Sequence, residues 1–202
     1  MWNTYLKSVR VLIVDDQDFI RSLLRHILGV LGCAHITDAP DSETAWDIII
    51  GNPPDLLIVD WEMPGISGIE LVNRVRNDKK SPDRFMPIIM VTAHTERPRI
   101  LTARDAGVNE FVMKPVSAKT LFSRLNAVIE HPRRFVRTKD YFGPDRRRKR
   151  VFVDFERRDR KKKETVVDPK AINQRMSQDD INSMLDPADK KGEAAHAAAT
   201  NK

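Results

Sequence analysis

Five polar residues at four places in the chain have the types and settings that phosphoryl-transfer chemistry needs. Two acids follow the apolar run 11–14, a third acid follows the run 56–59, a hydroxyl follows the run 88–91, and an ammonium follows 111–113; they are Asp15, Asp16, Asp60, Thr92 and Lys114. Clustered carboxylates repel unless a cation joins them, and a few hard oxygen ligands suit Mg²⁺. A carboxylate can attack phosphorus to form an aspartyl phosphate, while a metal ion and an ammonium neutralise the charge that develops. Brought together, these residues would form a site for phosphoryl transfer.

The stretch 55–68 is expected to hold the central acid of that site. Residues 56–59 are apolar at every position, which predicts a strand covered on both faces, as in a parallel sheet between helices. Asp60 ends the strand, and burying its carboxylate costs free energy unless a cation or hydrogen-bond donors meet it. A turn rich in Pro and Gly follows, then a helix. The other polar residues at strand ends are expected to supply the partners of Asp60.

Strands and helices are expected to alternate five times within residues 1–130. The expected strands span 9–14, 35–38, 56–60, 87–92 and 110–113, and the expected helices span 19–31, 41–50, 68–77, 97–106 and 117–130. In the first helix, Asp18 is the expected N-cap and Phe19 is expected to begin the apolar stripe. The alternation predicts a doubly wound α/β domain with a five-stranded parallel sheet of the flavodoxin-like kind. Ligand sites in such sheets lie beyond the carboxyl ends of the strands.

The order of these motifs resembles that of response-regulator receiver domains over about residues 9–130. The matching segments are Val-Asp15-Asp16, Val-Asp60-x-x-Met-Pro64-x-x-x-Gly68, Thr92-Ala93 and Phe111-Val-Met-Lys114-Pro115. The domain is most similar to single-domain chemotaxis regulators, which share the Asp60-Trp61 pair, and we expect no DNA-binding or catalytic output domain after it. This resemblance is carried by the ordered set at strand ends, because one Asp or one Lys-Pro alone is common.

The resemblance implies a role for each matching residue. Asp60 would accept phosphate from the phosphohistidine of a histidine kinase or phosphotransfer protein. Mg²⁺ would be held by Asp15, Asp16, Asp60 and the backbone carbonyl of Glu62. Lys114 would contact the phosphate and form a cis peptide with Pro115. Thr92 would swing toward the phosphate, and Phe111 would turn inward. These movements would remodel the face made by residues 97–106, 110–113 and 117–130.

Three of these positions also allow other interpretations. Phe111 also fits an ordinary aromatic residue at a strand edge. Glu62 and His94 stand where the family tunes phosphate hydrolysis, although Glu62 replaces the Asn of the chemotaxis regulator and His94 also fits a solvated loop residue. Beyond its own phosphoryl transfer and hydrolysis, the domain offers no further catalytic constellation, so we expect a signalling protein rather than an enzyme.

Residues 131–175 form a basic arginine-rich extension. Residues 131–163 hold 15 Lys and Arg against 5 Asp and Glu, a net charge of +10, whereas residues 1–130 have a net charge of −2. Residues 133–175 lack sustained apolar periodicity, which predicts that they are largely disordered on their own. The charge asymmetry indicates a polyanionic partner.

The arginines of this extension lie on both sides of 151–155; they are Arg146, Arg147, Arg148, Arg150, Arg157, Arg158 and Arg160. Guanidinium groups bind phosphate bidentately, stack on bases and can take guanine O6 and N7 together. Nucleic acid, an anionic membrane surface and a guanine dinucleotide would all fit, as would a solvated arm without a specific ligand. The composition is similar to the arginine-rich tails of chemotaxis-regulator-like proteins that bind cyclic di-GMP. That resemblance favours cyclic di-GMP, whose binding would fold the arm back on the receiver.

Residues 176–186 predict a short amphipathic helix, followed by a disordered tail over 187–202. Ser177 is the expected N-cap, and Ile181, Met184 and Leu185 form an apolar stripe. So short a helix is marginal alone and is expected to fold when its stripe finds a groove. The segment resembles the N-terminal peptide of the flagellar motor switch protein that docks on phosphorylated chemotaxis regulators. This implies docking on a receiver face, its own or another's; a tail helix without a partner is the alternative.

The composition indicates the cellular compartment in which the protein is expected to work. Cys33 is the only cysteine, which fits a reducing cytoplasm, and no apolar run approaches the roughly 20 residues needed to span a bilayer. Two functions remain open. The first is a phosphorylation-switched adaptor of the chemotaxis or motility apparatus. The second is a receiver-controlled protein that binds nucleic acid or an anionic membrane.

Overall fold

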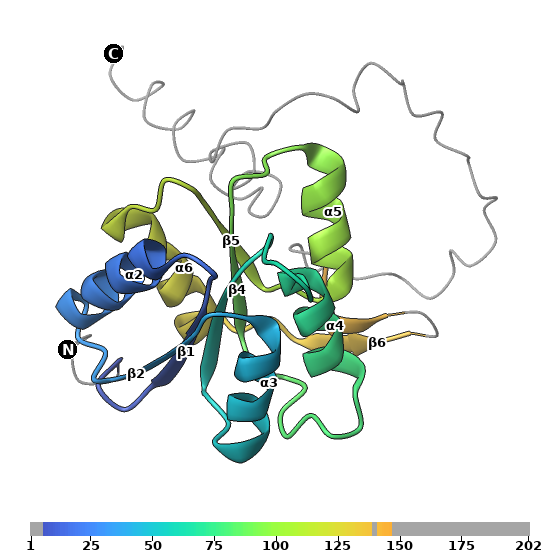
Figure 1. Cartoon of the computed structure of the whole chain (residues 1–202). Coiled ribbons are helices and arrows are strands. Elements are labelled where there is room, and N and C mark those ends of the chain that lie inside the picture. The colour runs from blue at the N-terminus through green and yellow to red at the C-terminus, as the bar shows by residue number, and fades with distance from the viewer. Residues whose placement is uncertain (1–5, 139–140, 147–202) are drawn as a thin grey trace, which may run out of the picture.

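The computed structural model describes residues 6–138 and 141–146, and its elements alternate as the sequence predicts (Figure 1). In chain order they are β1 (Arg10–Val14), α2 (Asp18–Val30), β2 (His35–Ala39), α3 (Ser42–Gly51), β3 (Leu56–Asp60), α4 (Gly68–Asn77), β4 (Ile88–Thr92), α5 (Arg97–Ala106), β5 (Glu110–Met113), α6 (Ala118–Glu130), β6 (Phe135–Arg137) and β7 (Phe142–Pro144). None of the helices in these two ranges has the length and apolar character that crossing a bilayer requires.

The central sheet has the strand order β2-β1-β3-β4-β5, and every neighbouring pair is parallel. This is the flavodoxin-like order, in which the chain leaves β1 toward one edge of the sheet and returns to build the other edge from β3 onward. The two directions separate between β1 and β3, and the crevice beyond the carboxyl ends of these strands is where such sheets bind ligands. The predicted doubly wound fold is confirmed, and its crevice lies where Asp15, Asp16 and Asp60 follow or end their strands.

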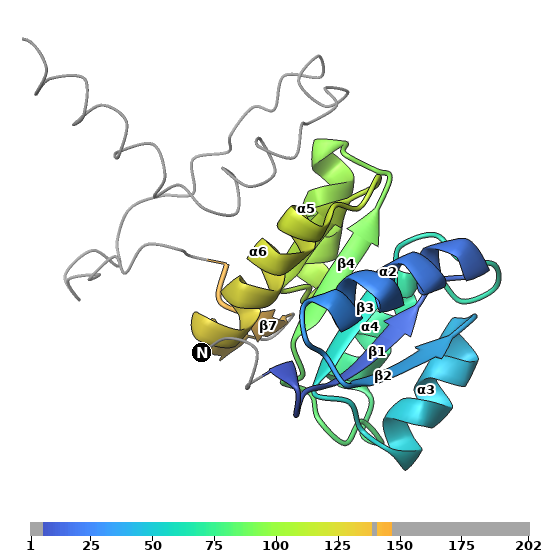
Figure 2. The same cartoon turned by 90° about the vertical axis from the view of Figure 1, so that its left-hand side faces the viewer.

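Helices cover both faces of the sheet (Figure 2). One apolar core joins the sheet to α3, α4 and α5, and a second joins its other face to α2 and α6. All residues of β3 and β4 are buried as a result, which explains why these strands are apolar without alternation. Burial of each Leu, Ile or Val side chain contributes roughly 1.5–3 kcal/mol, so the strand that carries Asp60 is among the best-anchored parts of the fold.

Side-chain caps fix where several helices begin. The Asp41 carboxylate accepts a hydrogen bond from the Thr44 backbone N–H at the start of α3, and Ser117 does the same for Thr120 at the start of α6. The prediction of Asp18 as a cap is wrong. Gln17 occupies the N-cap position of α2 without a side-chain cap bond, and Asp18 lies in the first turn.

The prediction that Phe19 begins the apolar stripe of α2 is also wrong, because its side chain is 74% exposed. The stripe that faces the core contains Ile20, Leu24, Ile27 and Leu28. A helix turns by about 100° per residue, so Phe19 lies beside that stripe, in line with the exposed His26 seven positions later.

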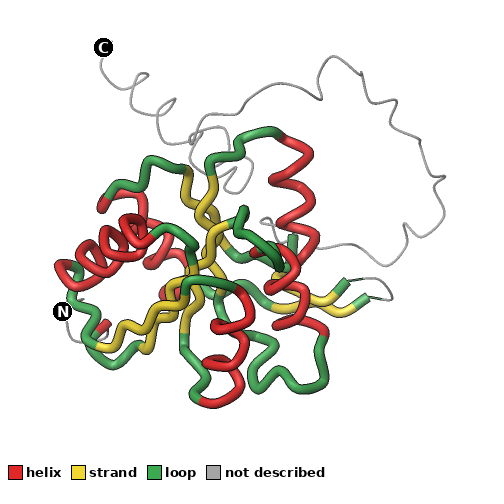
Figure 3. Tube along the Cα trace, viewed as in Figure 1, coloured by secondary structure: helices red, strands yellow, loops and turns green. Residues whose placement is uncertain are grey.

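The expectation that residues 133–175 are largely disordered is wrong for 135–137 and 142–144. Strands β6 and β7 pair antiparallel and form a hairpin that packs beside α4 and α5 (Figure 3). Phe135 and Phe142 of the hairpin meet Phe85 from the loop before β4, with ring centroids 5.1 and 5.3 Å from that of Phe85. Aromatic contacts between the hairpin and Phe85 therefore hold the hairpin on the domain, although its short strands show no apolar alternation.

A buried arginine supports the same contact. Arg76, at the end of α4, is fully buried and donates hydrogen bonds to the Gly107 carbonyl, the Asn109 side-chain oxygen and the Arg84 carbonyl. Burial lowers the pKa of Arg76 to about 9. Its guanidinium carbon lies 5.1 Å from the centre of the Phe135 ring, which adds a cation–π contact to the hairpin.

Candidate functional site

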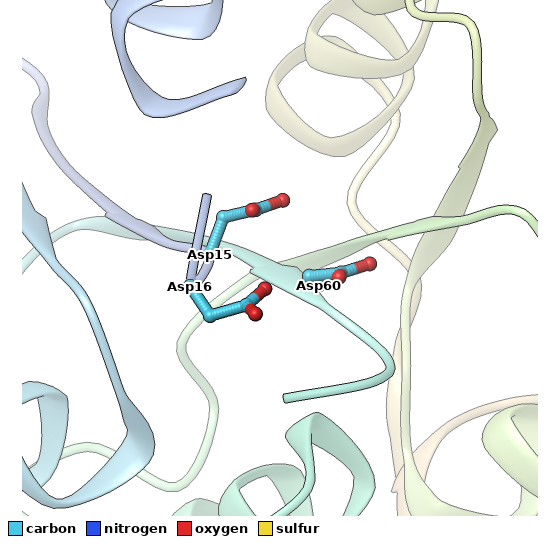
Figure 4. A group of neighbouring side chains, drawn as sticks. All are labelled: Asp15, Asp16 and Asp60. Atoms are coloured by element: carbon cyan, nitrogen blue, oxygen red, sulfur yellow. The ribbon is translucent and has the colours of Figure 1, made fainter. Parts of the chain in front are cut away.

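Three carboxylates gather beyond the carboxyl ends of β1 and β3 (Figure 4). Asp15 and Asp16 follow β1 and Asp60 ends β3, and one carboxylate oxygen of each lies within 4.8 Å of the others. Asp15 and Asp60 are buried, whereas Asp16 is exposed. The structure thus brings together the three acids that the sequence predicts as neighbours.

Lys114 follows β5, the strand at one edge of the sheet, and its side chain reaches these acids. Its Nζ atom lies 3.0 Å from Asp15 Oδ2 and 3.0 Å from Asp60 Oδ2. The backbone N–H of Lys114 donates to the Thr92 carbonyl, which fixes the turn after β5 against the end of β4. The peptide bond between Lys114 and Pro115 is cis, as predicted.

The charges in this cluster do not balance. Two carboxylates within 4.8 Å repel by roughly 3 kcal/mol at an effective dielectric constant of about 20. Burial raises the pKa of Asp60, with Asp15 adding to the rise and Lys114 opposing it. Burial also disfavours the Lys114 ammonium, but its hydrogen bonds to Asp15 and Asp60 outweigh this and raise the pKa of Lys114. Three ionised acids facing one ammonium leave two negative charges, which a divalent cation would compensate.

The donor set fits Mg²⁺. All three side chains offer carboxylate oxygens, which are hard ligands, and the exposed Asp16 leaves one side of the cluster open to water. Mg²⁺ keeps several waters and is typically held by a few carboxylates together with the phosphate of a substrate. The predicted contribution of the Glu62 backbone carbonyl stays a prediction.

A polar bridge that the sequence did not predict connects the loops beside the acids. The Glu62 carboxylate lies 2.5 Å from His94 Nε2 and accepts a hydrogen bond from Arg99 Nη1 at 2.8 Å. The Arg99 hydrogen bond is the main reason why the pKa of Glu62 is lowered. His94 also meets the Trp61 ring edge-to-face, with centroids 6.2 Å apart. His94 is therefore a paired residue and not the solvated loop residue that one interpretation allowed.

The hydroxyl and the aromatic residue predicted to respond to phosphate both lie inside the fold. Thr92 is buried at the end of β4, where its Oγ1 accepts a hydrogen bond from the His94 backbone N–H at 2.9 Å. Phe111 lies on β5 opposite Met90 and is 1% exposed. Its side chain is buried, but β5 is an edge strand of the sheet, so the predicted switch role of Phe111 and the alternative of an ordinary strand-edge aromatic both stay predictions.

Gly68 controls how closely α4 approaches β3, the strand that carries Asp60. Its backbone N–H donates to the Trp61 carbonyl, and a Cβ atom added at this position would lie 1.9 Å from the backbone oxygen of Asp60. Only glycine permits that approach. Ser67 caps the helix there in a reciprocal box with Glu70, so the turn that follows Asp60 is fixed at both of its ends.

The receiver domain model of response regulators matches residues 11–126, which include every residue of this site. The chain belongs to the response regulator receiver domain family. Asp15, Asp16, Asp60, Thr92 and Lys114 thus lie within the receiver domain, whereas the β6–β7 hairpin follows the matched residues.

Several curated relatives are similar to this receiver. "Chemotaxis protein CheY" of Pseudomonas aeruginosa is 36% identical over 122 residues, which cover 60% of this chain and 97% of the relative. The "Chemotaxis protein CheY homolog" of Campylobacter jejuni is 38% identical over 122 residues, with coverage of 60% and 92%. The phosphate regulon transcriptional regulatory protein PhoB of Pseudomonas aeruginosa is 36% identical over 119 residues, 59% of this chain and 51% of PhoB.

Solved structures show the same receiver fold. Chemotaxis protein CheY4 of Vibrio cholerae superposes with a TM-score of 0.56 at 30% identity, covering 60% of this chain and 98% of CheY4. The receiver domain of the Francisella response regulator 1452 superposes with a TM-score of 0.55 at 25% identity, covering 61% and 98%. Both likenesses concern the receiver part of the chain and leave the arginine-rich extension outside the comparison.

Of the seven arginines predicted to bind a ligand, the described residues include Arg146 alone. Arg146 lies over the Tyr141 ring, 3.8 Å from its centre, and its Nη1 is 3.2 Å from Asp105 Oδ1. The remaining predicted arm arginines, Arg147, Arg148, Arg150, Arg157, Arg158 and Arg160, lie outside the described residues, as do Ile181, Met184 and Leu185 of the predicted tail helix. Their roles stay predictions.

Proposed function

We propose that this protein is a phosphorylation-switched response regulator that accepts a phosphoryl group on Asp60 from a histidine kinase or a phosphotransfer protein. The observation that carries this proposal is Lys114, whose Nζ lies 3.0 Å from both Asp15 and Asp60 at the switch point of the sheet. An ammonium and a buried carboxylate side by side, with two further acids next to them, match the requirements of an aspartyl phosphate site.

The transfer is a substitution at phosphorus. An Asp60 carboxylate oxygen forms the new bond to phosphorus, while the bond from phosphorus to the donor's imidazole nitrogen breaks and its electron pair stays on that nitrogen. Lys114 exchanges its contact with Asp60 for one with a phosphoryl oxygen and keeps Asp15 as its second partner. Thr92 ends the neighbouring strand and supplies a hydroxyl that can donate to another phosphoryl oxygen.

Asp15, Asp16 and Asp60, with the Glu62 backbone carbonyl, are the residues proposed to hold Mg²⁺. Bound there, the ion neutralises charge on the phosphoryl oxygens during transfer. The chain's own part is to keep the three carboxylates close despite their repulsion, and β1 and β3 do this because they are adjacent and are buried at the ends that carry the acids. In the proposed role the domain assists only its own phosphorylation and hydrolysis and has no separate substrate.

The proposed output is protein–protein contact in chemotaxis or motility. Support comes from relatives that are named as chemotaxis proteins and that this chain matches over nearly their full length. A flagellar motor switch protein or another receiver domain is the proposed partner. PhoB, a relative named as a transcriptional regulatory protein, matches over about half its own length. Similarity within the receiver domain alone therefore does not distinguish a protein–protein output from a transcriptional one.

The arginine-rich extension is proposed to bind cyclic di-GMP and to modify those contacts. Its support is the clustering of arginines around 146–160 and the net charge of +10 over 131–163. Calorimetry with cyclic di-GMP and with an unrelated oligonucleotide, at two salt concentrations, tests this part. Saturable dinucleotide binding that persists at the higher salt supports it. Binding of either polyanion that salt abolishes would instead favour the nucleic-acid or membrane function.

The acceptor is tested by labelling with acetyl phosphate in the presence of Mg²⁺. Asp60→Asn is expected to abolish labelling, whereas the matched change Asp47→Asn, at an exposed acid on α3, is expected to leave it intact. Labelling that persists in Asp60→Asn places the acceptor elsewhere and overturns the proposal.

A second experiment distinguishes ligand binding by the arginine-rich extension from phosphorylation of the receiver domain. Replacing Arg146, Arg147, Arg148, Arg157 and Arg158 by Gln is expected to remove dinucleotide binding and to spare phosphorylation. Replacing 161–163, which are lysines, by Gln is the control that lowers the charge while keeping the arginines. Loss of phosphorylation in the arginine variant would mean that the arm is integral to the receiver fold.

A further inference from the structure

A fourth acid lies beside the acidic cluster without being one of its three members. Glu62 follows Asp60 by two residues, and two residues of extended chain span at most about 7 Å, so their Cα atoms lie within that distance of each other. The backbone on both sides of Glu62 is held, because the Trp61 N–H donates to the Val91 carbonyl and the Met63 side chain is buried. The Glu62 side chain therefore stays next to the proposed acceptor.

A negative charge at this place acts on an anionic phosphoryl donor. Three ionised acids and the Lys114 ammonium leave two negative charges, and a divalent cation brings that sum to zero. An ionised Glu62 adds one further negative charge, which repels the incoming phosphoryl group. Water and salt screen this repulsion only in part, because the Debye length at 0.1 M ionic strength is about 10 Å. Fast transfer therefore requires a cation that compensates Glu62.

Arg99 of α5 provides that cation. Its Nη1 atom donates a hydrogen bond to Glu62 Oε1 at 2.8 Å. Arg99 lies in the first turn of α5, and its neighbour Ile100 is buried in the core, so this turn is fixed relative to the sheet. His94 Nε2 lies 2.5 Å from the same Glu62 oxygen and holds the carboxylate from the loop after β4.

The pair between Glu62 and Arg99 is poorly explained by a role in folding. The Glu62 side chain is 62% exposed and that of Arg99 is 43% exposed. Ion pairs with this much exposure add little to stability, because water screens them and two long side chains must be ordered. Compensation of a charge next to a reacting group requires no such burial.

We infer that Arg99 is a positioning residue for phosphorylation, which pairs with Glu62 and so cancels a negative charge beside Asp60. The inference rests on the proposed function of Asp60 as the acceptor and adds a residue of α5 to the groups that set the rate of transfer. Arg99 acts through Glu62 in this role and not on the phosphoryl group itself. Its loss therefore matters only while Glu62 is present as a carboxylate.

The test is a double-mutant cycle on the full chain, with the initial rate of labelling by acetyl phosphate in Mg²⁺ as the readout. At about 0.1 M ionic strength, Arg99→Gln is expected to slow labelling about threefold, the size that Coulomb's law in water gives for one charge about 7 Å from a doubly charged phosphoryl group after screening. Adding Glu62→Gln to Arg99→Gln is expected to restore the wild-type rate. Arg99→Lys is expected to retain most of it, because it keeps the charge.

Two controls separate charge compensation from other effects. Arg97→Gln removes the same charge from the same turn of α5, at an exposed arginine, and is expected to label at the wild-type rate. At about 1 M ionic strength the Debye length is about 3 Å, so the deficit of Arg99→Gln is expected to disappear. Thermal unfolding without phosphodonor is expected to be nearly the same for Arg99→Gln as for the wild type.

The outcomes distinguish this inference from the proposed function. A deficit in Arg99→Gln that Glu62→Gln reverses and that high salt removes supports the inference. An equal deficit with and without Glu62→Gln would mean that Arg99 acts directly on the donor. That result, a wild-type rate in Arg99→Gln, an equal deficit in Arg97→Gln, or a slower rate in Glu62→Gln alone overturns the inference and leaves Asp60 as the acceptor. A wild-type protein that is not labelled overturns the proposed function, and the inference with it.

Discussion

Gly68→Ala is expected to disturb the acceptor site without altering any polar group in it. The new Cβ atom would lie 1.9 Å from the Asp60 backbone oxygen, 1.1 Å short of the 3.0 Å below which such contacts are essentially unknown. Both atoms belong to rigid parts of the fold, because Asp60 ends a fully buried strand and Gly68 begins α4. Strand and helix must therefore separate by about an ångström.

That separation has two expected consequences. Overpacking of this kind costs about 1–3 kcal/mol, so the free energy of unfolding measured by urea denaturation should fall by that amount. A displacement of about 1 Å at a reacting group can cost about 100-fold in rate, and the initial rate of labelling by acetyl phosphate should fall to that degree. Labelling is measured at a temperature where the variant remains folded, so that the two effects are separated.

Gly29→Ala is the matched control. Gly29 lies within α2, and a Cβ atom added there would meet nothing within 4 Å. Alanine is favoured over glycine inside a helix, so stability should stay the same or rise by up to about 1 kcal/mol, with labelling unchanged. If Gly68→Ala labels at the wild-type rate with wild-type stability, the reasoning that α4 sets the position of Asp60 is refuted.

Three other predictions concern the metal, a helix cap and the hairpin. Chelation by EDTA should stop labelling of Asp60, and added Mg²⁺ should restore it; labelling in EDTA would argue against the metal site. Asp41→Ala should cost about 1 kcal/mol at neutral pH. Because the hydrogen bond from Thr44 lowers the pKa of Asp41, the charge-dependent part of this cost should be complete above the ordinary carboxyl value of 3.8 and should be lost as the pH falls through the lowered pKa, which denaturation across a pH series will check. Phe135→Ala should cost about 1–2 kcal/mol through its aromatic contacts, whereas the exposed Phe19→Ala should cost little; equal costs would contradict the packing described.

The acidic cluster follows closely from the sequence because parallel strands align their carboxyl ends. Once the apolar runs before Asp15 and Asp60 are assigned to adjacent strands, the acids must converge, and the structure places them within 4.8 Å. Lys114 follows from the same rule through β5. The polar bridge of Glu62 and His94 could not be predicted in this way, since it joins two loops whose paths depend on packing rather than on periodicity.

The hairpin shows that very short strands are hard to predict from apolar patterns in the sequence. Strands β6 and β7 have three residues each, too few for an alternation of apolar and polar positions to stand out. Two residues that stabilise it, Phe85 and Arg76, lie 50 and 59 residues before Phe135 in the chain. Phe19 illustrates the opposite error: its apolar side chain fits a helical stripe in the sequence, but in the structure the stripe begins at Ile20.

Transfer from a phosphohistidine donor tests the central claim most directly. The wild-type protein is mixed with a phosphorylated histidine phosphotransfer domain and Mg²⁺, and the product is mapped by peptide mass spectrometry. The account predicts one phosphoryl group, on Asp60. A phosphoryl group found on any other residue, or none in the presence of an active donor, would contradict it.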